Sequence, residues 1–213
     1  MIRGSNATQV RRWGPATSAL VRRLATVTEP IHQVALAGEL RVSQPRISQI
    51  VRLLTQAGIN LNRLDDPSQR RLLVDLYVRH HRQDTESDAL YYGLDAPYDQ
   101  VHELVHEARR AAVRVAVSAD LAPDLVAPWR SPTLTVVYVD RPFTPGSLVP
   151  ALARGEASVI VRLVTDPALV EPGEVRRDLP LAHPVQQVWD LYDLGGGDRI
   201  EAANRLLDAV IVE

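Results

Sequence analysis

The chain has 213 residues and a formal net charge of −2, with 46% hydrophobic and 23% charged residues, which suits a soluble globular protein of two small domains, each with its own core. It contains no cysteine, so disulfides, thiolate zinc sites and cysteine nucleophiles are excluded. No apolar stretch approaches the length of a membrane span and no leader opens the chain, so we expect a cytoplasmic protein without a membrane partner.

The charge is distributed unevenly along the chain. Residues 1–71 hold 11 arginines and four acidic residues, a balance of +7. Residues 72–213 hold 13 arginines and 22 acidic residues, a balance of −9. A basic segment suits a partner that carries phosphate groups. We therefore expect one domain for phosphates and a second, acidic domain with a different role.

The first predicted helix covers Pro15–Ala25. The residues expected to face inward are Leu20, Val21 and Leu24. Arg22 and Arg23 are expected to face outward, so this helix would support the two that follow it.

Residues 31–59 predict two helices joined by a tight turn. The inner face of the first is expected to consist of Ile31, Val34, Ala37 and Leu40. In the second, apolar residues at i, i+3, i+4 and i+7 predict a buried face made of Ile47, Ile50, Val51 and Leu54. The opposite face carries Pro45, Gln49, Arg52 and Gln56, with Arg46 and Ser48 on its flanks. A water-facing row of arginine and glutamine indicates a polar partner.

The ends of this second helix also carry signals. Ser43 is a suitable N-cap, and a proline is tolerated in the first turn. After Gly58, only Ile59–Leu64 precedes Asp65, so any β-hairpin there must be very short or absent. Asp66 is expected to cap a further helix that starts at Pro67 and connects the two domains.

From residue 84 the pattern changes to alternating strands and helices, which predicts an α/β domain with a mixed, mainly buried sheet. The expected strands are Ala89–Leu94, Val113–Ser118, Leu134–Asp140 and Ser158–Val164. The expected helices are Tyr98–Ala112, part of Ala119–Ala127, Val185–Leu194 and Asp198–Ile211, the last capped by Asp198. We expect Glu171–Leu181, with its prolines and charges, to be a surface loop. The glycines at 195–197 predict a helix C-cap and turn, since they follow a helix and lack the Lys-Ser/Thr of a phosphate-binding loop.

One motif suggests an enzyme. His102-Glu103-Leu104-Val105-His106 matches the H-E-x-x-H pattern that places two imidazoles one helical turn apart for zinc. Glu107 follows where such helices carry an uncharged residue, and no third ligand is specified downstream. The alternative is a solvated helix face, which we favour; we therefore expect no catalytic residue, no metal and no cofactor.

Residues 36–58 resemble the winged helix-turn-helix of bacterial repressors. The resemblance rests on Leu36-Ala37, Leu40, Val42-Ser43-Gln44-Pro45, Ile47-Ser48 and Ala57-Gly58. Arg41 departs from it, because the family usually has glycine in the turn, and a left-handed conformation is one way to accommodate the change.

The acidic part resembles the carboxy-terminal domain of AbiEi-type antitoxins. The similar stretches are Ser118–Pro123, Ala127–Trp129, Thr135–Val139, His183–Gln187, Asp190-Leu191, Leu194–Gly196, Glu201–Ala203 and Leu206. The resemblance implies an α+β protein of two domains: a winged helix-turn-helix with a short wing at 11–66, a connecting helix at 67–83, and an α/β antitoxin-like domain with a mixed sheet at 84–213. It also implies an antitoxin that represses its own operon and neutralises a nucleotidyltransferase-like toxin.

Together these features predict a sequence-specific DNA-binding transcriptional regulator that acts as a repressor and is not an enzyme. The helix that starts at Gln44 would enter the major groove of an operator, with Arg46 and Gln49 on base edges. The remaining expected DNA-binding residues are Ser43, Gln44, Pro45, Ser48 and Arg52, supported by Arg12, Arg22 and Arg23. A homodimer on an inverted repeat would fit such a unit. Two other hypotheses stay open, a stand-alone ligand-responsive repressor and a zinc peptidase fused to a DNA-binding module.

Overall fold

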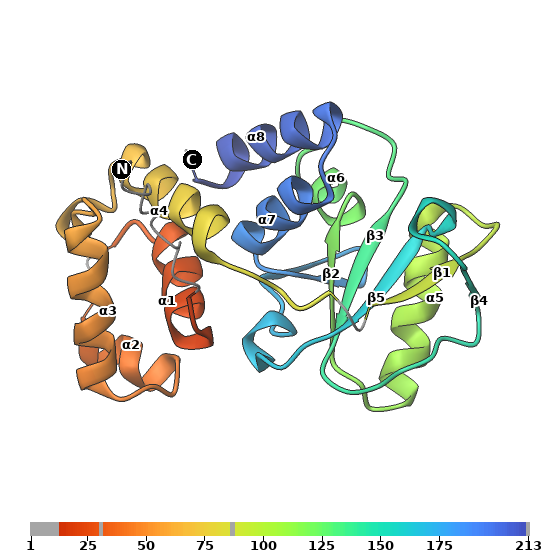
Figure 1. The fold of residues 1–213 in the computed structure, drawn as a ribbon, viewed down its shortest axis with the longest axis horizontal. Coiled ribbons are helices and arrows are strands. Elements are labelled where there is room, and N and C mark those ends of the chain that lie inside the picture. Colours follow the sequence, from red (N-terminus) through yellow and green to blue (C-terminus); the bar gives the residue numbers. More distant parts are fainter. Residues whose placement is uncertain (1–12, 30–31, 86–87, 212–213) are drawn as a thin grey trace, which may run out of the picture.

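The computed structural model describes residues 13–29, 32–85 and 88–211. In these residues the chain is an α+β protein with eight α-helices and one mixed sheet of seven strands (Figure 1). The first four helices form one end of the molecule, which we call the helical unit. The sheet and the other helices form the α/β unit. Arg12 and Ile31, for which we made predictions, lie outside the described residues.

The helical unit contains α1 (Pro15–Ala25), α2 (Gln33–Glu39), α3 (Gln44–Gln56), the short 3-10 turn η1 (Leu61–Arg63) and α4 (Pro67–His80). α1 packs against α4, and α2 packs against α3. The predicted bounds of α1 are confirmed, and so is the Asp66 cap, whose carboxylate accepts a hydrogen bond from Ser68 N. Arg41, between α2 and α3, has a φ of 52°, so the left-handed turn that its sequence suggested is present.

Four details of the helical unit differ from the predictions. Val34 is 68% exposed, and Leu36 is the residue of α2 that is buried. Ser43 occupies the N-cap position of α3, but its side chain makes no capping hydrogen bond. Between Gly58 and Pro67, all of which is described, the chain forms η1 and no strand. The short wing implied by the resemblance is therefore missing, which agrees with the other outcome expected for so short a segment, an absent hairpin. Arg22 points into the protein, as described below.

The sheet has the strand order β4-β1-β5-β3-β2-β7-β6. Its strands are β1 (Ala89–Tyr92), β2 (Val115–Ala119), β3 (Thr135–Val139), β4 (Val149–Pro150), β5 (Val159–Leu163), β6 (Glu174–Arg176) and β7 (Leu179–Leu181). The pairs β3–β5 and β2–β7 are parallel and the other four pairs are antiparallel, which confirms the predicted mixed sheet.

The two faces of the sheet are covered by different helices. α5 (Pro97–Arg110) packs on the face that bears Val117, Val137 and Val161. α7 (Pro184–Leu194) lies on the opposite face, and α8 (Gly197–Ile211) packs on α7. The short helix α6 (Leu121–Val126) directly follows β2.

Two predictions for the α/β unit are wrong. The segment Glu171–Leu181 is not only a surface loop, since it contains the β6–β7 hairpin, and Leu179 and Leu181 are fully buried. α8 begins at Gly197, with Ile200 N donating to Gly196 O, so Asp198 lies in its first turn and is not its cap. The predicted glycine C-cap is confirmed, because Gly195 and Gly196 have φ values of 71° and 96°.

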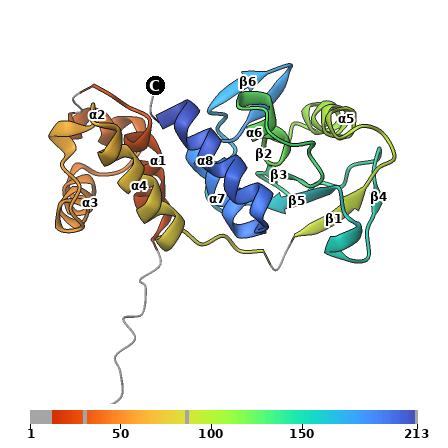
Figure 2. The same cartoon turned by 90° about the horizontal axis from the view of Figure 1, so that it is seen from above.

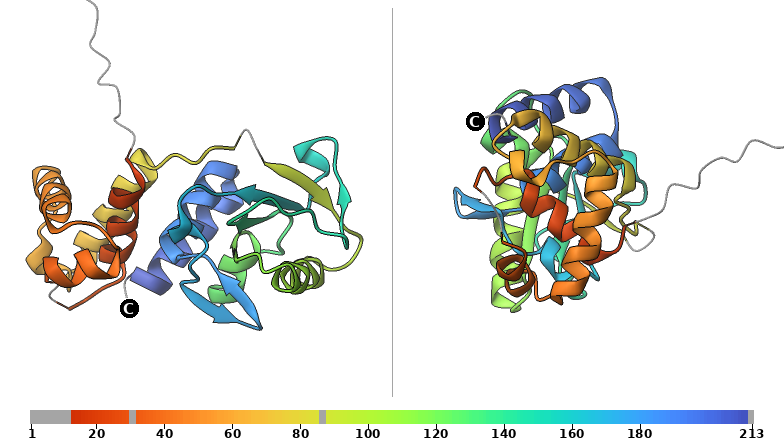
Figure 3. Two further views of the ribbon diagram at one scale, coloured as in Figure 1. Left: turned by 90° about the horizontal axis from the view of Figure 1, so that it is seen from below. Right: turned by 90° about the vertical axis from the view of Figure 1, so that its left-hand side faces the viewer.

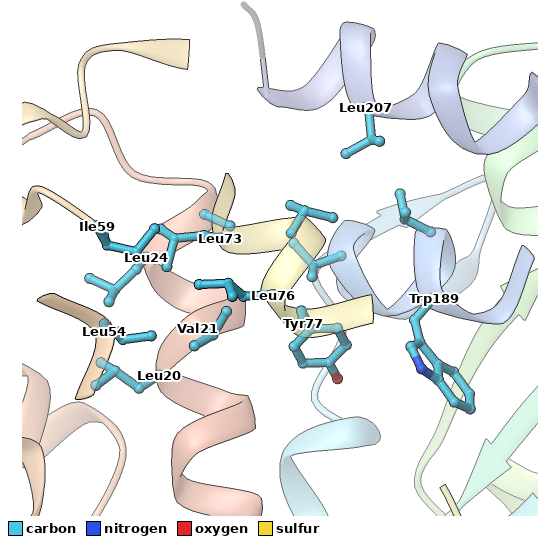
Figure 4. Packing of buried hydrophobic residues seen from close by; sticks show 14 of the residues in the cluster. Leu20, Val21, Leu24, Leu54, Ile59, Leu73, Leu76, Tyr77, Trp189 and Leu207 are labelled. Atoms are coloured by element: carbon cyan, nitrogen blue, oxygen red, sulfur yellow. The ribbon is translucent and has the colours of Figure 1, made fainter. Parts of the chain in front are cut away.

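The helical unit shares its core with α7 and α8, contrary to the expectation of separate cores (Figures 2 and 4). Leu76 and Tyr77 of α4 lie in one apolar cluster with Val188 and Trp189 of α7 and Leu207 of α8. α4 is therefore part of both units and is more than a connecting helix. In the described residues no helix is both long and apolar enough to cross a membrane.

Candidate nucleic-acid interface

α3 lies at the outer end of the helical unit, and the α/β unit lies behind it in the end-on view (Figure 3, right). Ile47, Ile50 and Leu54 are buried, as the periodicity predicts, whereas Val51, the fourth residue of the predicted face, is only half-buried. The residues of its other face and leading turn are exposed: Ser43, Gln44, Pro45, Arg46, Gln49 and Arg52. Within the described part of the chain these side chains are solvent-exposed, so the row is accessible to a partner.

The exposed face of α3 is positively charged. From Ser43 to Gly58 the chain has no acidic residue. Among the described residues Arg41, Arg46 and Arg52 form no ion pair, whereas Arg63 and Arg71 at other places in the helical unit do. Three cations without counter-ions on one surface produce a local positive potential, which attracts phosphate groups.

Arg46 and Gln49, which we expect to read bases, are adjacent. Arg46 Nη1 donates a hydrogen bond to Gln49 Oε1 at 3.3 Å. The contact uses one of the five N–H donors of the guanidinium group, and both NH₂ donors of the Gln49 amide remain. The two side chains can therefore support each other while they bind a third group.

Ser48 has a different role from the one predicted. It is half-buried, and its Oγ donates to Gln33 Oε1 at 2.7 Å. The single hydroxyl hydrogen is therefore used inside the protein, where it ties α3 to α2, and it is not offered to a phosphate.

The prediction that Arg22 faces outward and supports phosphate binding is wrong. It is 3% exposed, its Nη1 donates to Tyr77 Oη at 2.9 Å, and its Nη2 lies 3.5 Å from Asp166 Oδ2. Burial by itself lowers the pKa of Arg22, but the Tyr77 hydroxyl and the Asp166 carboxylate raise it above its ordinary value. Arg22 is thus a buried cation that joins the two units.

Arg23 remains at the surface, where its Nε donates to Glu39 Oε1 at 2.6 Å. Exposed pairs of this kind are weak, about 0–1 kcal/mol, so Arg23 can exchange its partner. Arg41, in the turn before α3, is the candidate contact that the predictions missed. Its signal in the sequence was the replacement of the usual turn glycine.

The H-E-x-x-H motif lies on α5. Val101, Leu104 and Val105 are buried, and the rings of His102 and His106 contact each other edge to face at 4.6 Å. Glu103 pairs with Arg110 at 3.3 Å, and Glu107 Oε2 accepts from Gly146 N. Within the described part of the chain, no group of three His, Asp or Glu side chains is arranged to hold a metal ion.

Comparison of the chain with models of protein families, with curated proteins and with solved structures gives no match, so the function must be argued from the residues themselves.

Proposed function

We propose that the protein is a sequence-specific DNA-binding transcriptional regulator and that α3 is its recognition helix. The observation that carries this proposal is the exposed face of α3, where Arg46, Gln49 and Arg52 lie opposite the buried Ile47 and Leu54 with no acidic residue between them. An α-helix fits the major groove of B-DNA, and a positive face offsets the phosphate charge on both sides of that groove.

The chemistry of the side chains suggests how the work is divided. Arg46 can donate two hydrogen bonds to guanine and Gln49 can pair with adenine, so these two would read bases. Arg52 and Arg41 flank them and would contact phosphates, together with the Ser43 hydroxyl at the start of α3. Base contacts specify the sequence, whereas phosphate contacts position the protein on it.

We further propose that the regulator is the autorepressing antitoxin of a toxin–antitoxin pair. The support is the resemblance of residues 118–206 to AbiEi-type antitoxins and the acidic charge of residues 72–213. In this scheme the α/β unit binds a nucleotidyltransferase-like toxin in the cytoplasm, and a homodimer binds an inverted repeat. Co-purification of the chain with the product of the neighbouring gene tests this part, and it fails if that product neither binds nor is neutralised.

A stand-alone, ligand-responsive repressor is the second candidate, and one feature favours it. A pocket of about 400 Å³ lies between the start of α1 and the end of β5, with Trp13, Ser18, Leu163 and Asp166 in its lining. A small molecule there would touch both units. A ligand that raises the melting temperature and changes DNA affinity would favour this candidate over the antitoxin.

The test of DNA binding starts with selection of bound duplexes from a random pool. Arg46→Ala and Gln49→Ala should each weaken binding to the selected duplex by about 1–3 kcal/mol, with little change on a scrambled duplex. Arg110→Ala, which removes an exposed arginine of α5, is the matched control and should bind like the parent. If no sequence is enriched, the proposal is wrong; equal losses on both duplexes would mean that these residues touch only phosphate.

A further inference from the structure

A chain of four hydrogen bonds runs from the helical unit into the α/β unit. Arg22 Nη1 donates to Tyr77 Oη at 2.9 Å, and Tyr77 Oη donates to Gln186 Oε1 at 2.6 Å. Gln186 Nε2 then donates to Tyr138 Oη at 2.7 Å, and Tyr138 Oη donates to Asp190 Oδ1 at 2.7 Å. All five side chains are buried. We call this set the Arg22–Asp190 chain.

The chemistry of its two ends fixes the direction of every bond in the chain. A guanidinium group can only donate and a carboxylate can only accept. Each tyrosine hydroxyl has one hydrogen, so it must accept from the arginine side and donate toward the aspartate side. Hydrogen bonds aligned in this way polarise one another, and those that end on a charge are the strongest.

The chain crosses the boundary between the units at one point. Arg22 belongs to α1 and Tyr77 to α4, whereas Gln186 belongs to α7 and Tyr138 to β3. Two ion pairs also cross this boundary, Arg22–Asp166 at 3.5 Å and Arg71–Asp208 at 3.1 Å. The contacts of Leu76 and Trp189 in the shared core are apolar (Figure 4). Apolar packing is non-directional, whereas hydrogen bonds require a definite distance and angle. The orientation of α4 on α7 is therefore set by the Tyr77–Gln186 bond more strictly than by the core.

The far end of the chain depends on the charge of Asp190. Its carboxylate accepts from Ser118 Oγ at 2.5 Å and from Tyr138, and it lies 3.4 Å from Arg162 Nη1. Arg162 is held in turn by Asp88, at 2.7 Å. The other charged or titratable groups that face this region are Asp193 on α7, Tyr77 on α4, and His81, which contacts Trp189 of α7 edge to face at 4.9 Å.

We propose that the Arg22–Asp190 chain is a conformational coupling device: it holds the helical unit in one orientation on the α/β unit while Asp190 is charged, and releases it when that charge is lost. A neutral carboxyl group is a weaker acceptor for Tyr138, so the last bond of the chain weakens and the bonds before it lose their polarisation. This coupling between the two units is independent of DNA binding, because it concerns only how the helical unit packs on the α/β unit.

The charge of Asp190 is lost in mild acid. Burial raises the pKa of Asp190 to about 6, against the opposing effects of Arg162, Ser118 and Tyr138. A fall from pH 8 to pH 5 therefore neutralises the end of the chain.

The test measures the distance between the two units in the full chain, without DNA. Because the protein has no cysteine, Gln56→Cys on α3 and Arg110→Cys on α5 give two unique sites for spin labels. We expect one narrow distance distribution at pH 8 for the otherwise unchanged chain. Tyr77→Phe and Gln186→Leu, which each break the chain, should broaden the distribution or shift its maximum. Tyr98→Phe removes a hydroxyl that bonds to Arg177 O within the α/β unit, so this control should leave the distribution narrow.

The pH dependence tests the role of Asp190 without breaking the chain. At pH 5 the parent protein should show the broad distribution of Tyr77→Phe, with a midpoint near the pKa of Asp190. Asp190→Asn should show no such transition, whereas His81→Gln should keep it. A parent distribution that is the same at pH 5 and pH 8, or a transition that persists in Asp190→Asn, would overturn the proposal. So would narrow, unshifted distributions in both chain-breaking variants.

Discussion

Arg162 is the buried cation whose removal should reveal most about the electrostatics of the core. It is fully buried in β5, donates to both carboxylate oxygens of Asp88 at 2.7 and 2.8 Å, and lies 3.4 Å from Asp190. Arg162→Met keeps the aliphatic part of the side chain and removes the charge. The carboxylates of Asp88 and Asp190, whose side chains are 9% and 1% exposed, then lack the cation that they share.

The expected loss follows from the cost of an unpaired buried charge. Breaking a buried ion pair by removing one partner destabilises a protein by about 3–5 kcal/mol. We therefore expect Arg162→Met to lower the free energy of unfolding by about 3–5 kcal/mol at pH 8, a large part of the 5–15 kcal/mol that is typical of a domain. Urea denaturation followed by circular dichroism measures this difference.

The loss should depend on pH in a definite direction. Because the folded pKa of Asp190 is raised to about 6, its contribution to stability is present at low pH and falls as the pH rises toward 6. The positive charge of Arg162 lowers the pKa of Asp190, so the removal of Arg162 raises that pKa further. The loss of stability with rising pH then continues to a higher pH. At pH 5, where Asp190 carries a proton in both proteins, Arg162→Met should cost less than at pH 8.

A surface arginine provides the comparison. Arg114 is half exposed and pairs with Asp140 at 3.0 Å, so Arg114→Met should cost only about 0–1 kcal/mol. Arg162→Met/Asp190→Asn should recover part of the loss seen in the single variant. A loss below about 1 kcal/mol for Arg162→Met at pH 8, or one that does not change with pH, would show that the buried network is not held by charge.

Three further results are expected. Arg41→Gly should raise the free energy of unfolding by about 1 kcal/mol, because it removes the strain of a φ of 52°, and should lower the salt dependence of DNA binding by about one ion; an unchanged slope would exclude Arg41 from phosphate contact. A chain that ends at Gln83 should unfold more easily than the full protein by circular dichroism, since it exposes the face of α4 that α7 and α8 cover; a stable, cooperative fragment would contradict the shared core. After dialysis, elemental analysis should find no stoichiometric zinc; one zinc per chain that is lost in His102→Ala would restore the peptidase hypothesis.

The sequence predicted those elements whose signals are local. The bounds of α1 are the same in the prediction and in the structure. The four predicted strands end within two residues of the observed ones, because each strand contains a run of apolar residues. β7 was missed because it has only three residues, and its pairing with β2 joins Leu181 to Val117 across a long stretch of chain. The inner face of α2 was predicted only in part: Ala37 and Leu40 pack against the core, but Val34 is exposed and the buried Leu36 was missed, because seven residues give too few turns to define a phase.

The candidate interface was predictable for a related reason. The exposed row on α3 follows from the burial of Ile47, Ile50 and Leu54, which are neighbours in the sequence. The burial of Arg22 was not predictable, because its partners Tyr77 and Asp166 are distant in the sequence and only the fold brings them together. Helical periodicity gives the direction in which a side chain points around the helix axis, but it does not show which other part of the protein packs against that side chain.

The charges of the chain therefore have two separate roles, and burial decides between them. Arg41, Arg46 and Arg52 are exposed and form no ion pair with the described residues, so their charges are available to a partner. Arg22 and Arg162 are buried and paired with carboxylates, so they are not available to a partner at the surface, although they count equally in the net charge. Arg22 belongs to residues 1–71, whose basic balance therefore overstates their positive surface. The exposed arginines that remain lie on α3 and in the turn before it, which makes substitutions there a more decisive test of DNA binding than any change in the net charge of the helical unit.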